Sequence, residues 1–278
     1  MNHFIFVTCL LYLVCKTTEF KLTDITPPPQ EPIDSIISMT DLQKNVAIIG
    51  WPHQFEATGT GFLITSPSKR NPNVFATFLV TAKHVIYPIK DDHLYINLHW
   101  DTNETDGENL IYNGNNQNVF LNSDTSIDIA LIFIGYSKKN MIPVSIIPNV
   151  SELNNLKLSK DEQSFYIGLN DNKISFLNAV AKINYGSIDE ALHTRAFEDS
   201  MHQYINFKFD GFPGVSGSPI FINFLNQPYL IGVLIQKSTG ERIRDKTGKI
   251  IGIVPSEESI FSGIPSYYIR EIVEQTSF

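Results

Sequence analysis

The sequence predicts an all-β protein made of two packed antiparallel β-barrels with a C-terminal helix. Three observations lead to this architecture. Short runs of β-branched and aromatic residues recur along the chain, separated by clusters of Gly, Asn, Asp and Pro. These runs fall into two sets on either side of a polar stretch with two prolines, Ser137–Asn149. Apolar residues at helical spacing near the C-terminus predict the terminal helix.

The two sets of strands divide a single predicted domain, residues 41–278. Barrel one is expected at about 41–140, with strands at Asn45–Trp51, Thr58–Thr65, Val74–Thr81, Leu94–Trp100 and Ile127–Gly135. Barrel two is expected at about 150–262, with strands at Ser164–Leu169, Phe176–Asn184, Gln203–Phe209, Ser218–Asn223 and Tyr229–Lys237. The helix is expected at about 265–275, where a Pro-Ser pair suits its first turn.

The N-terminal residues have the pattern of a targeting segment. Phe4–Val14 is an unbroken, moderately apolar stretch, shorter than the ~20 residues that a membrane-spanning helix needs. It fits the apolar core of a secretory signal peptide, predicted at 1–20, and predicts a secreted or periplasmic protein with no stable membrane span. A buried N-terminal strand or helix is the alternative. Four prolines in Thr26–Pro32 predict an extended linker over residues 21–40.

Both cysteines of the chain, Cys9 and Cys15, lie in or beside the predicted signal peptide. If the chain is cleaved after Cys15, the mature protein has no cysteine, so we expect no disulfide framework and a fold held by its core alone. Attachment of a lipid to Cys15 is a second possibility for this segment.

The composition excludes several functional classes. The formal net charge is −8, so the chain has no general attraction to phosphate backbones, and we expect no nucleic-acid partner. Apolar residues make up 42% of the chain, which is enough for a sizeable core. We expect no metal or other cofactor, because metal-ligand spacing such as H-E-x-x-H is missing around the histidines interpreted as surface or packed side chains: His53, His93, His99, His193 and His202.

The first of three informative motifs is FLVTAKHV, Phe78–Val85. A hydrophobic strand ends in Thr-Ala, and His84 follows on a short turn. A rigid apolar support of this kind can hold a general base in a defined position.

The second motif is SIDIALI, Ser126–Ile132. Asp128 is expected to open an apolar strand, so its carboxylate should be partly buried. A buried carboxylate needs a hydrogen-bond partner, and the N–H of an imidazole is a suitable one.

The third motif is FDGFPGVSGSPIF, Phe209–Phe221. Ser216 sits in a glycine-rich loop between two predicted strands. Gly214 allows the backbone to turn so that its own N–H and that of Ser216 point at one spot, as an oxyanion hole requires. Each of the three motifs alone is common in structural roles, but together they occur in the order His, Asp, Ser, which is one of the known orders of a catalytic triad.

The segments TAKHV, DIAL and GVSGSP resemble the three signature segments of the trypsin-like, chymotrypsin-fold serine peptidases. TGTGFLI resembles the glycine-bearing strand at the matching place before the histidine. The C-terminal segment GIPSYYIREIVEQ is similar to the segment that closes HtrA-type protease domains, which places the resemblance nearer to the HtrA-type, bacterial-like branch than to animal trypsins. It covers roughly Leu42 to the C-terminus.

The resemblance implies a role for each motif residue. Ser216 is the expected nucleophile of a serine endopeptidase that acts on protein or peptide substrates. His84 is the expected general base and acid, and Asp128 orients it. The backbone N–H groups of Gly214 and Ser216 are expected to stabilise the oxyanion.

The sequence departs from the family pattern in several places. Val215 replaces the Asp that, in animal trypsins, pairs with the new amino terminus after zymogen cleavage, so we expect activity without that cleavage. Ser218 replaces the second glycine of the more common Ser-Gly-Gly-Pro pattern. No PDZ-like domain is expected after the terminal helix.

Two residues are candidates for substrate specificity. Asp210 lies at the place where trypsins carry the acid that binds Lys or Arg, although an ordinary loop position is the alternative. Lys237 lies in the strand expected to border the pocket and would favour acidic side chains instead.

Two further functions stay open beside that of a general endopeptidase. The chain could be a catalytically silent protease-fold protein that serves in binding or adhesion. It could also be a self-processing peptidase of narrow specificity. The triad pattern argues against the silent protein, and nothing in the sequence separates a general peptidase from a self-processing one. The oligomeric state also cannot be read from the sequence.

Overall fold

A computed structural model of the chain describes residues 37–50, 57–71, 73–87, 93–98, 108–113, 118–138, 141–169, 181–197, 200–209, 214–224, 226–237, 241–244, 250–254 and 260–276. The predicted signal peptide and most of the predicted linker lie outside these ranges. The first described element is helix α1, Met39–Lys44, whose first two residues fall within the predicted linker. Ser38 caps this helix by accepting a hydrogen bond from the N–H of Asp41. None of the helices in the described part of the chain is long and apolar enough to span a membrane.

The first half of the domain is an antiparallel sheet in the order β5-β4-β1-β2-β3-β7-β6, with the short strand β8 pairing in parallel with β2. β2 and β3 lie at its centre and pair from Gly61 opposite Thr81 to Pro67 opposite Phe75. Among the described residues these strands form one eight-stranded sheet that is not closed by backbone pairing. The strands are β1 (Val46–Gly50), β2 (Ala57–Pro67), β3 (Phe75–Thr81), β4 (His93–Leu98), β5 (Glu108–Asn113), β6 (Val119–Leu121), β7 (Ala130–Ser137) and β8 (Ile142–Pro143).

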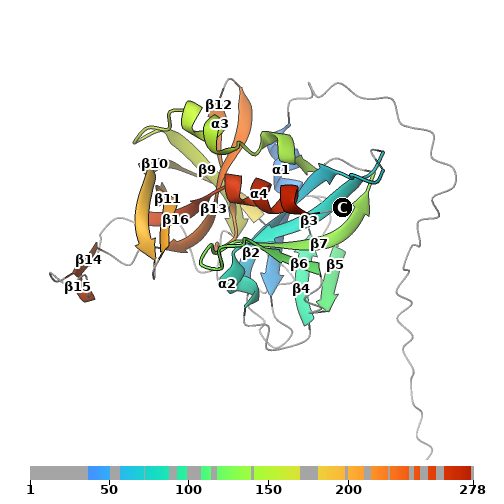
Figure 1. Cartoon of the computed structure of the whole chain (residues 1–278), viewed down its shortest axis with the longest axis horizontal. Helices are drawn as coiled ribbons and strands as arrows, with labels where there is room; N and C mark the ends of the chain where they lie inside the picture. Colours follow the sequence, from blue (N-terminus) through green and yellow to red (C-terminus); the bar gives the residue numbers. More distant parts are fainter. Residues whose placement is uncertain are drawn as a thin grey trace, which may run out of the picture. The chain divides into compact units, whose positions relative to one another are not determined.

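The second half is a closed barrel in the order β10-β11-β16-β13-β12-β9. Figure 1 shows its strands grouped together, in colours that belong to the second half of the sequence. A separate two-stranded ribbon, β14 (Glu241–Arg244) with β15 (Ile250–Val254), follows β13 in the chain. The barrel strands are β9 (Gln163–Leu169), β10 (Ala181–Phe197), β11 (Ser200–Phe209), β12 (Pro219–Phe224), β13 (Gln227–Lys237) and β16 (Ile260–Pro265).

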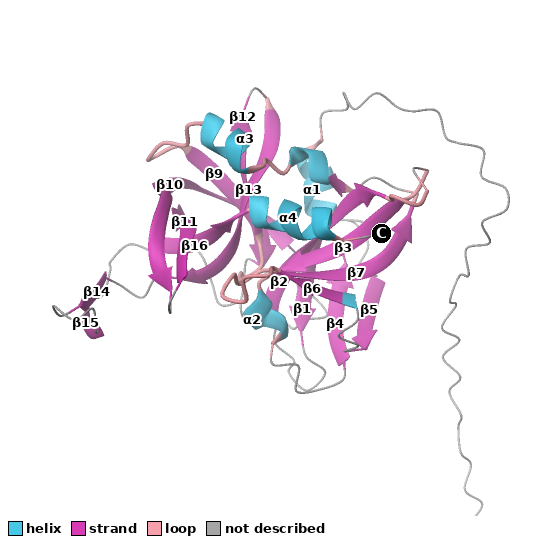
Figure 2. Ribbon diagram, viewed as in Figure 1, coloured by secondary structure: helices cyan, strands magenta, loops and turns pink. Residues whose placement is uncertain are grey.

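The predicted all-β architecture with a C-terminal helix is confirmed, and Figure 2 shows how few helices accompany the strands. Several local predictions need correction. Ile260–Pro265 forms β16, a strand that the sequence interpretation did not anticipate. Strand β7 begins at Ala130, so Asp128 precedes the strand and does not open it. The polar connection contains β8 and the one-turn 3-10 helix Val144–Ile146.

The region predicted to begin barrel two begins with a helix instead. Helix α3 covers Val150–Asn155, and its start is a capping box in which Asn149 and Glu152 each accept a backbone N–H of the other. The terminal helix α4 covers Tyr267–Gln275. Ser266 is the residue before the first turn, and its side chain makes no capping hydrogen bond. Its hydroxyl donates to the carbonyl of Leu230 in β13, which ties the start of α4 to the barrel.

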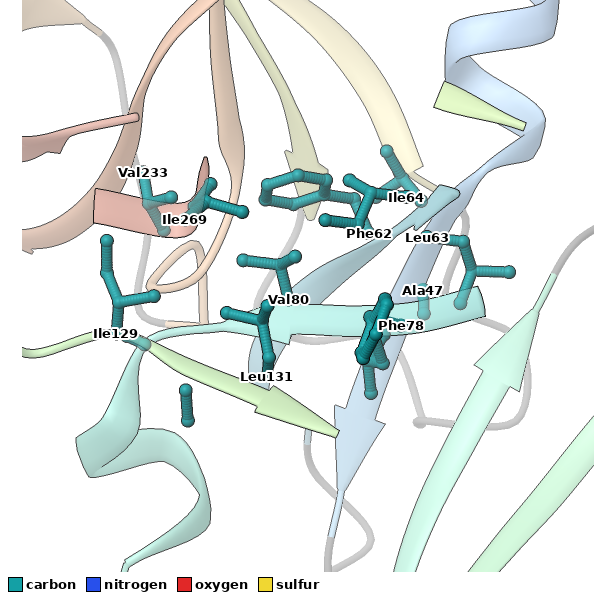
Figure 3. Packing of buried hydrophobic residues seen from close by; sticks show 14 of the residues in the cluster. Ala47, Phe62, Leu63, Ile64, Phe78, Val80, Ile129, Leu131, Val233 and Ile269 are labelled. Carbon is teal, nitrogen blue, oxygen red and sulfur yellow. The ribbon is translucent and has the colours of Figure 1, made fainter. Parts of the chain in front are cut away.

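Two clusters of buried side chains hold the fold together. One fills the barrel and includes Phe207 and Ile220. The other begins in the first sheet and continues across to β13 and α4, and Figure 3 shows Ile129, just before β7, beside Val233 of β13 and Ile269 of α4. Burying a side chain of this size contributes roughly 1.5–3 kcal/mol, so this second cluster joins the two halves into one structural unit.

Candidate active site

His84 lies on a one-turn helix, α2 (Lys83–Ile86), that follows directly after β3. Val85 and Ile86 are buried while the imidazole of His84 is 49% exposed. Gly59 in β2 leaves room for Val85, because a Cβ at position 59 would collide with the Val85 methyl groups. The buried neighbours of His84 therefore anchor the turn and direct the imidazole outward.

Asp128 contacts His84 at two points. Its Oδ2 lies 2.6 Å from the Nδ1 of His84, and its Oδ1 accepts the backbone N–H of His84 at 2.8 Å. Its own carbonyl accepts the N–H of Lys83 at 3.2 Å. The carboxylate is 27% exposed, and so partly buried. An ionised carboxylate accepts hydrogen bonds only, so Nδ1 carries the proton and Nε2 is left free to accept one.

Ser216 lies in a tight turn between the end of β11 and the start of β12. Gly214 and Gly217 both have left-handed backbone conformations, with φ of +92° and +91°, which favour glycine. The N–H of Ser218 donates to the carbonyl of Val215 at 3.0 Å and closes the turn. The glycine-rich pattern thus produces the turn that the sequence predicts.

The hydroxyl of Ser216 donates to the carbonyl of Ile235 in β13 at 3.1 Å. Between the described side chains of Ser216 and His84 the structure shows no hydrogen bond. Rotation about χ1 moves a serine oxygen between staggered positions, and hydrogen bonds between catalytic groups are often loose without substrate. The structure therefore joins His84 to Asp128 directly, and it connects the Ser216 loop to the strands before His84 by another route.

That route passes through Thr60, which is fully buried in β2. The N–H of Thr60 donates to the carbonyl of Ser216 at 2.8 Å, and its hydroxyl donates to the carbonyl of Gly214 at 2.9 Å. The hydroxyl of Thr81, three residues before His84, donates to the carbonyl of Thr60 at 2.7 Å. A Cβ on Gly217 would collide with the carbonyl oxygen of Thr60. The serine loop is thus packed against the strand pair that carries the histidine.

Sequence reasoning noticed the TGTG run of β2 as a glycine-bearing strand but assigned no role to Thr60. The long-range hydrogen bonds of Thr60 have no local signature, because Gly214 is 154 residues away in the chain.

The departures at Val215 and Ser218 fit into the packing. Val215 is 3% exposed and belongs to the core of the barrel. Ser218 is fully buried, and its Oγ has no hydrogen-bond partner among the described residues. Gly168 in β9 makes room for it, since a Cβ there would collide with the Ser218 hydroxyl. The missing side chain of Gly168 thus accommodates the hydroxyl of Ser218.

Of the two specificity candidates, one lies outside the described residues and the other at the end of a described strand. Asp210 lies outside the described residues. Lys237 is the last residue of β13, where its backbone pairs with Phe261 of β16. Among the described residues no group of three or more His, Cys, Asp or Glu side chains is placed to hold a metal ion.

The sequence matches no known family profile and no curated protein. Solved structures are similar in fold. The protease domain of MamO from Magnetospirillum magneticum superimposes with a TM-score of 0.52 at 14% identity, covering 83% of this chain and 96% of that domain. The HtrA-type protease AlgW, solved with a tripeptide, superimposes with a TM-score of 0.51 at 17% identity. The match covers 86% of this chain and 62% of AlgW, which is less than two thirds of the AlgW chain.

A third similar structure is an inactive serine-to-alanine variant of Rv3671c from M. tuberculosis H37Rv, with a TM-score of 0.50 and 12% identity. It covers 90% of this chain and 94% of the Rv3671c chain. All three matches extend over both the first sheet and the closed barrel, as their coverage requires. At these identities the likeness concerns the fold alone. This chain has the chymotrypsin fold that these protease domains share.

Proposed function

We propose that the chain is a secreted serine endopeptidase that hydrolyses peptide bonds through an acyl-enzyme, with His84, Asp128 and Ser216 as its triad. The observation that carries this proposal is the two-point contact between Asp128 and His84. A carboxylate that binds both the backbone N–H and the ring nitrogen of one histidine fixes that ring in position and in tautomer. The hydrogen bonds from Thr60 to the Ser216 loop also support the proposal.

In the first step the oxygen of Ser216 attacks the carbonyl carbon of the substrate, and its proton passes to Nε2 of His84. The substrate oxygen takes the negative charge, which the N–H groups of Gly214 and Ser216 stabilise. His84 then gives the proton to the leaving amine as the carbon–nitrogen bond breaks. Water attacks the resulting ester with His84 again as base, and the acid product and free Ser216 are released.

Val215 indicates that the Ser216 loop is held in place without an activating cleavage. Its side chain has no charge and lies in the barrel core, so it cannot pair with a new amino terminus. The segment AIIGW, Ala47–Trp51, resembles such a terminus only superficially. Its first four residues belong to the buried strand β1, between β2 and β4. The proposed peptidase therefore works without cleavage at β1, and the hydrogen bonds of Thr60 hold the loop instead.

Substrate preference rests on the family resemblance. Asp210 as a pocket acid would favour Lys or Arg side chains, whereas Lys237 at the pocket rim would favour acidic ones. The secretion that we propose rests on the apolar segment Phe4–Val14, with a lipid anchor at Cys15 as the alternative. Sequencing the N-terminus of the mature protein separates these two.

A catalytically silent binding protein is a second candidate, and one observation favours it. The Ser216 hydroxyl is engaged with Ile235 and not with His84. If the nucleophile is held away from its base in this way, the protein keeps its fold but does not catalyse hydrolysis.

The experiment that tests the proposal is digestion of a peptide mixture by the purified chain, with products identified by mass spectrometry. Ser216→Ala and His84→Ala should each abolish cleavage, with losses of several orders of magnitude. Asp128→Asn should reduce it by about 10⁴-fold while leaving the structure intact, because the amide favours the wrong tautomer of the imidazole. Cleavage that survives Ser216→Ala would overturn the assignment of Ser216 as nucleophile. A folded wild type that cleaves nothing would remove the proposal in favour of the silent binding protein.

A further inference from the structure

The loop that carries Asp128 runs from the end of β6 to the start of β7 and is folded by its own side chains. The Oδ1 of Asn122 accepts the N–H of Asp124 at 2.9 Å. The Oδ1 of Asp124 accepts the N–H of Ser126 at 3.1 Å, and its carbonyl accepts the N–H of Ile127 at 3.1 Å. These bonds give the loop a defined shape, but they do not attach it to the barrel that carries Ser216.

His202 makes that attachment. It belongs to β11 of the closed barrel, and its side chain is only 4% exposed. Its Nε2 lies 2.5 Å from the hydroxyl oxygen of Ser126, two residues before Asp128. Its Nδ1 lies 3.7 Å from Oδ2 of Asp124. Both nitrogens of a buried imidazole from one half of the molecule therefore face one loop of the other half.

The available protons decide the direction of these bonds. The hydroxyl of Ser126 lies 2.5 Å from Oδ1 of Asp124 and has one proton. Its hydrogen bonds to Asp124 lower the pKa of that carboxyl, so the carboxylate is ionised at neutral pH and can only accept. The hydroxyl proton thus goes to Asp124, and the Nε2 of His202 must donate to the oxygen of Ser126. Each hydrogen bond in the series from His202 through Ser126 to Asp124 therefore has one donor and one acceptor.

The opposite side of the same loop is held by the residue next to His84. The ammonium group of Lys83 donates to the carbonyl of Thr125, and the backbone N–H of Lys83 donates to the carbonyl of Asp128. The loop therefore lies between α2 on one side and β11 on the other. A shift of Ser126 would be transmitted through Ile127 to Asp128, and from both carboxylate oxygens of Asp128 to His84.

We propose that His202 is a positioning residue of the active site, which sets the Asp128–His84 pair relative to Ser216 by tying the Asp128 loop to the barrel. The inference rests on the proposed peptidase function and deepens it. Misplacement of a catalytic group by about 1 Å can reduce a rate by ~10²-fold. The sequence offered no sign of this role, because His202 and Ser126 are 76 residues apart.

The test compares variants of the full chain in three measurements. His202→Phe keeps a buried ring and removes both nitrogens, His202→Gln restores a polar group, and Ser126→Ala removes the hydroxyl. His193→Gln is the matched control, since His193 lies in β10 of the same barrel with a 14% exposed side chain and faces Glu190 at 3.6 Å. The measurements are the rate of labelling by a fluorophosphonate, the low-field proton resonance of the His84 Nδ1–H, and urea unfolding.

We expect His202→Phe and Ser126→Ala each to slow labelling by roughly tenfold to a hundredfold and to shift or broaden the His84 resonance. The double variant, His202→Phe with Ser126→Ala, should label no more slowly than the slower of the two single variants. Each change removes the same hydrogen bond between His202 and Ser126, so the second change has nothing further to remove. His202→Gln should recover part of the rate, and His193→Gln should label like the wild type. A purely structural role would lower the urea midpoint but leave the His84 resonance unchanged in the folded protein.

Folded His202→Phe and Ser126→Ala variants that label at the wild-type rate, with an unchanged resonance, would overturn the proposal. If His202→Phe does not fold, Ser126→Ala alone decides it. If the wild type itself is not labelled, the proposed peptidase function fails. The His84 resonance then still tells whether His202 positions the pair.

Discussion

The loops that carry Asp128 and Ser216 are fastened in different ways. The Asp128 loop is held mainly by side chains: those of Asp124, Ser126 and His202 form one connected set, and Lys83 adds an ammonium group. The Ser216 loop is held mainly by its backbone, which accepts hydrogen bonds from a neighbouring strand.

The packing of the Ser216 loop also differs from that of the Asp128 loop. Two glycines at positive φ let the backbone approach β2, and the carbonyls of Gly214 and Ser216 accept from the hydroxyl and N–H of Thr60. None of these groups titrates at ordinary pH. We therefore expect the Ser216 loop to be most sensitive to added bulk. The Asp128 loop should be most sensitive to loss of a polar or charged side chain.

The largest effect should come from Gly217→Ala. The new Cβ would meet the carbonyl oxygen of Thr60 at a position with φ of +91°, so both clash and backbone strain oppose folding. The unfolding free energy should fall by roughly 2–5 kcal/mol, with loss of fluorophosphonate labelling. Urea unfolding measures the first and labelling the second.

Gly135→Ala is the matched control for this change. Gly135 also has a positive φ, +148°, but apart from its own residue and its chain neighbours no atom of the described residues lies within 4 Å of the place of its Cβ. Strain alone should cost about 1–3 kcal/mol and leave labelling intact. Equal losses of stability and of labelling in the two variants would show that close packing against Thr60 has no special part in the Ser216 loop.

The next effect should come from Thr60→Val. This variant keeps the shape of the side chain but leaves the carbonyl of Gly214 without its donor, at a stability cost of about 1–3 kcal/mol. Turnover should fall by tenfold to a hundredfold, below the ~10²- to 10³-fold loss that follows removal of an oxyanion-hole donor itself.

Thr60→Ser keeps the hydroxyl and serves as the control, with turnover close to that of the wild type. Peptide hydrolysis under saturating substrate measures both variants. A Thr60→Val enzyme as fast as Thr60→Ser would mean that the hydroxyl does not hold the Gly214 loop in its working form.

The smallest effect concerns pH and belongs to the Asp128 loop. Hydrogen bonds from Ser126 hold the pKa of Asp124 below its ordinary value of 3.8. A lowered pKa in the folded state stabilises the protein above the unfolded-state pKa, and this contribution disappears as the pH falls through the folded-state pKa. Because Asp124 is 43% exposed, solvent screens the interaction and the contribution is small.

Urea midpoints at pH 7 and in the acid range, for the wild type and Asp124→Asn, measure this contribution. The variant should be less stable than the wild type at pH 7, and the difference should shrink below pH 3.8. A difference that stays constant or grows on acidification would show that the Asp124 carboxylate does not stabilise the loop by its charge.

Much of the fold could be predicted because the strands contain their own signals. Runs such as Val74–Thr81 and Gln203–Phe209 are β-branched or aromatic, and they end at turn residues. The observed strands β3 and β11 fall in these places. Strand β16 was missed because Ile260–Pro265 is short and contains Ser, Gly and Pro. It becomes a strand by pairing with β11 and β13.

For the candidate site, the sequence was informative about residues within motifs and uninformative about their supports. His84, Asp128 and Ser216 could be selected because each lies in a short segment with a recognisable local pattern. Thr60 and His202 act through hydrogen bonds across 154 and 76 residues, and no local pattern reports such contacts. The same holds for Gly168, whose missing side chain makes room for Ser218.

The central claim, that Ser216 is an activated nucleophile, is tested most directly by locating a covalent adduct. The wild-type chain and Ser216→Ala are treated with a fluorophosphonate, digested with a separate protease and analysed by mass spectrometry. We predict one phosphonyl group on Ser216 of the wild type and none on the variant. A folded wild type with no adduct, or with the adduct on another residue, would contradict the claim.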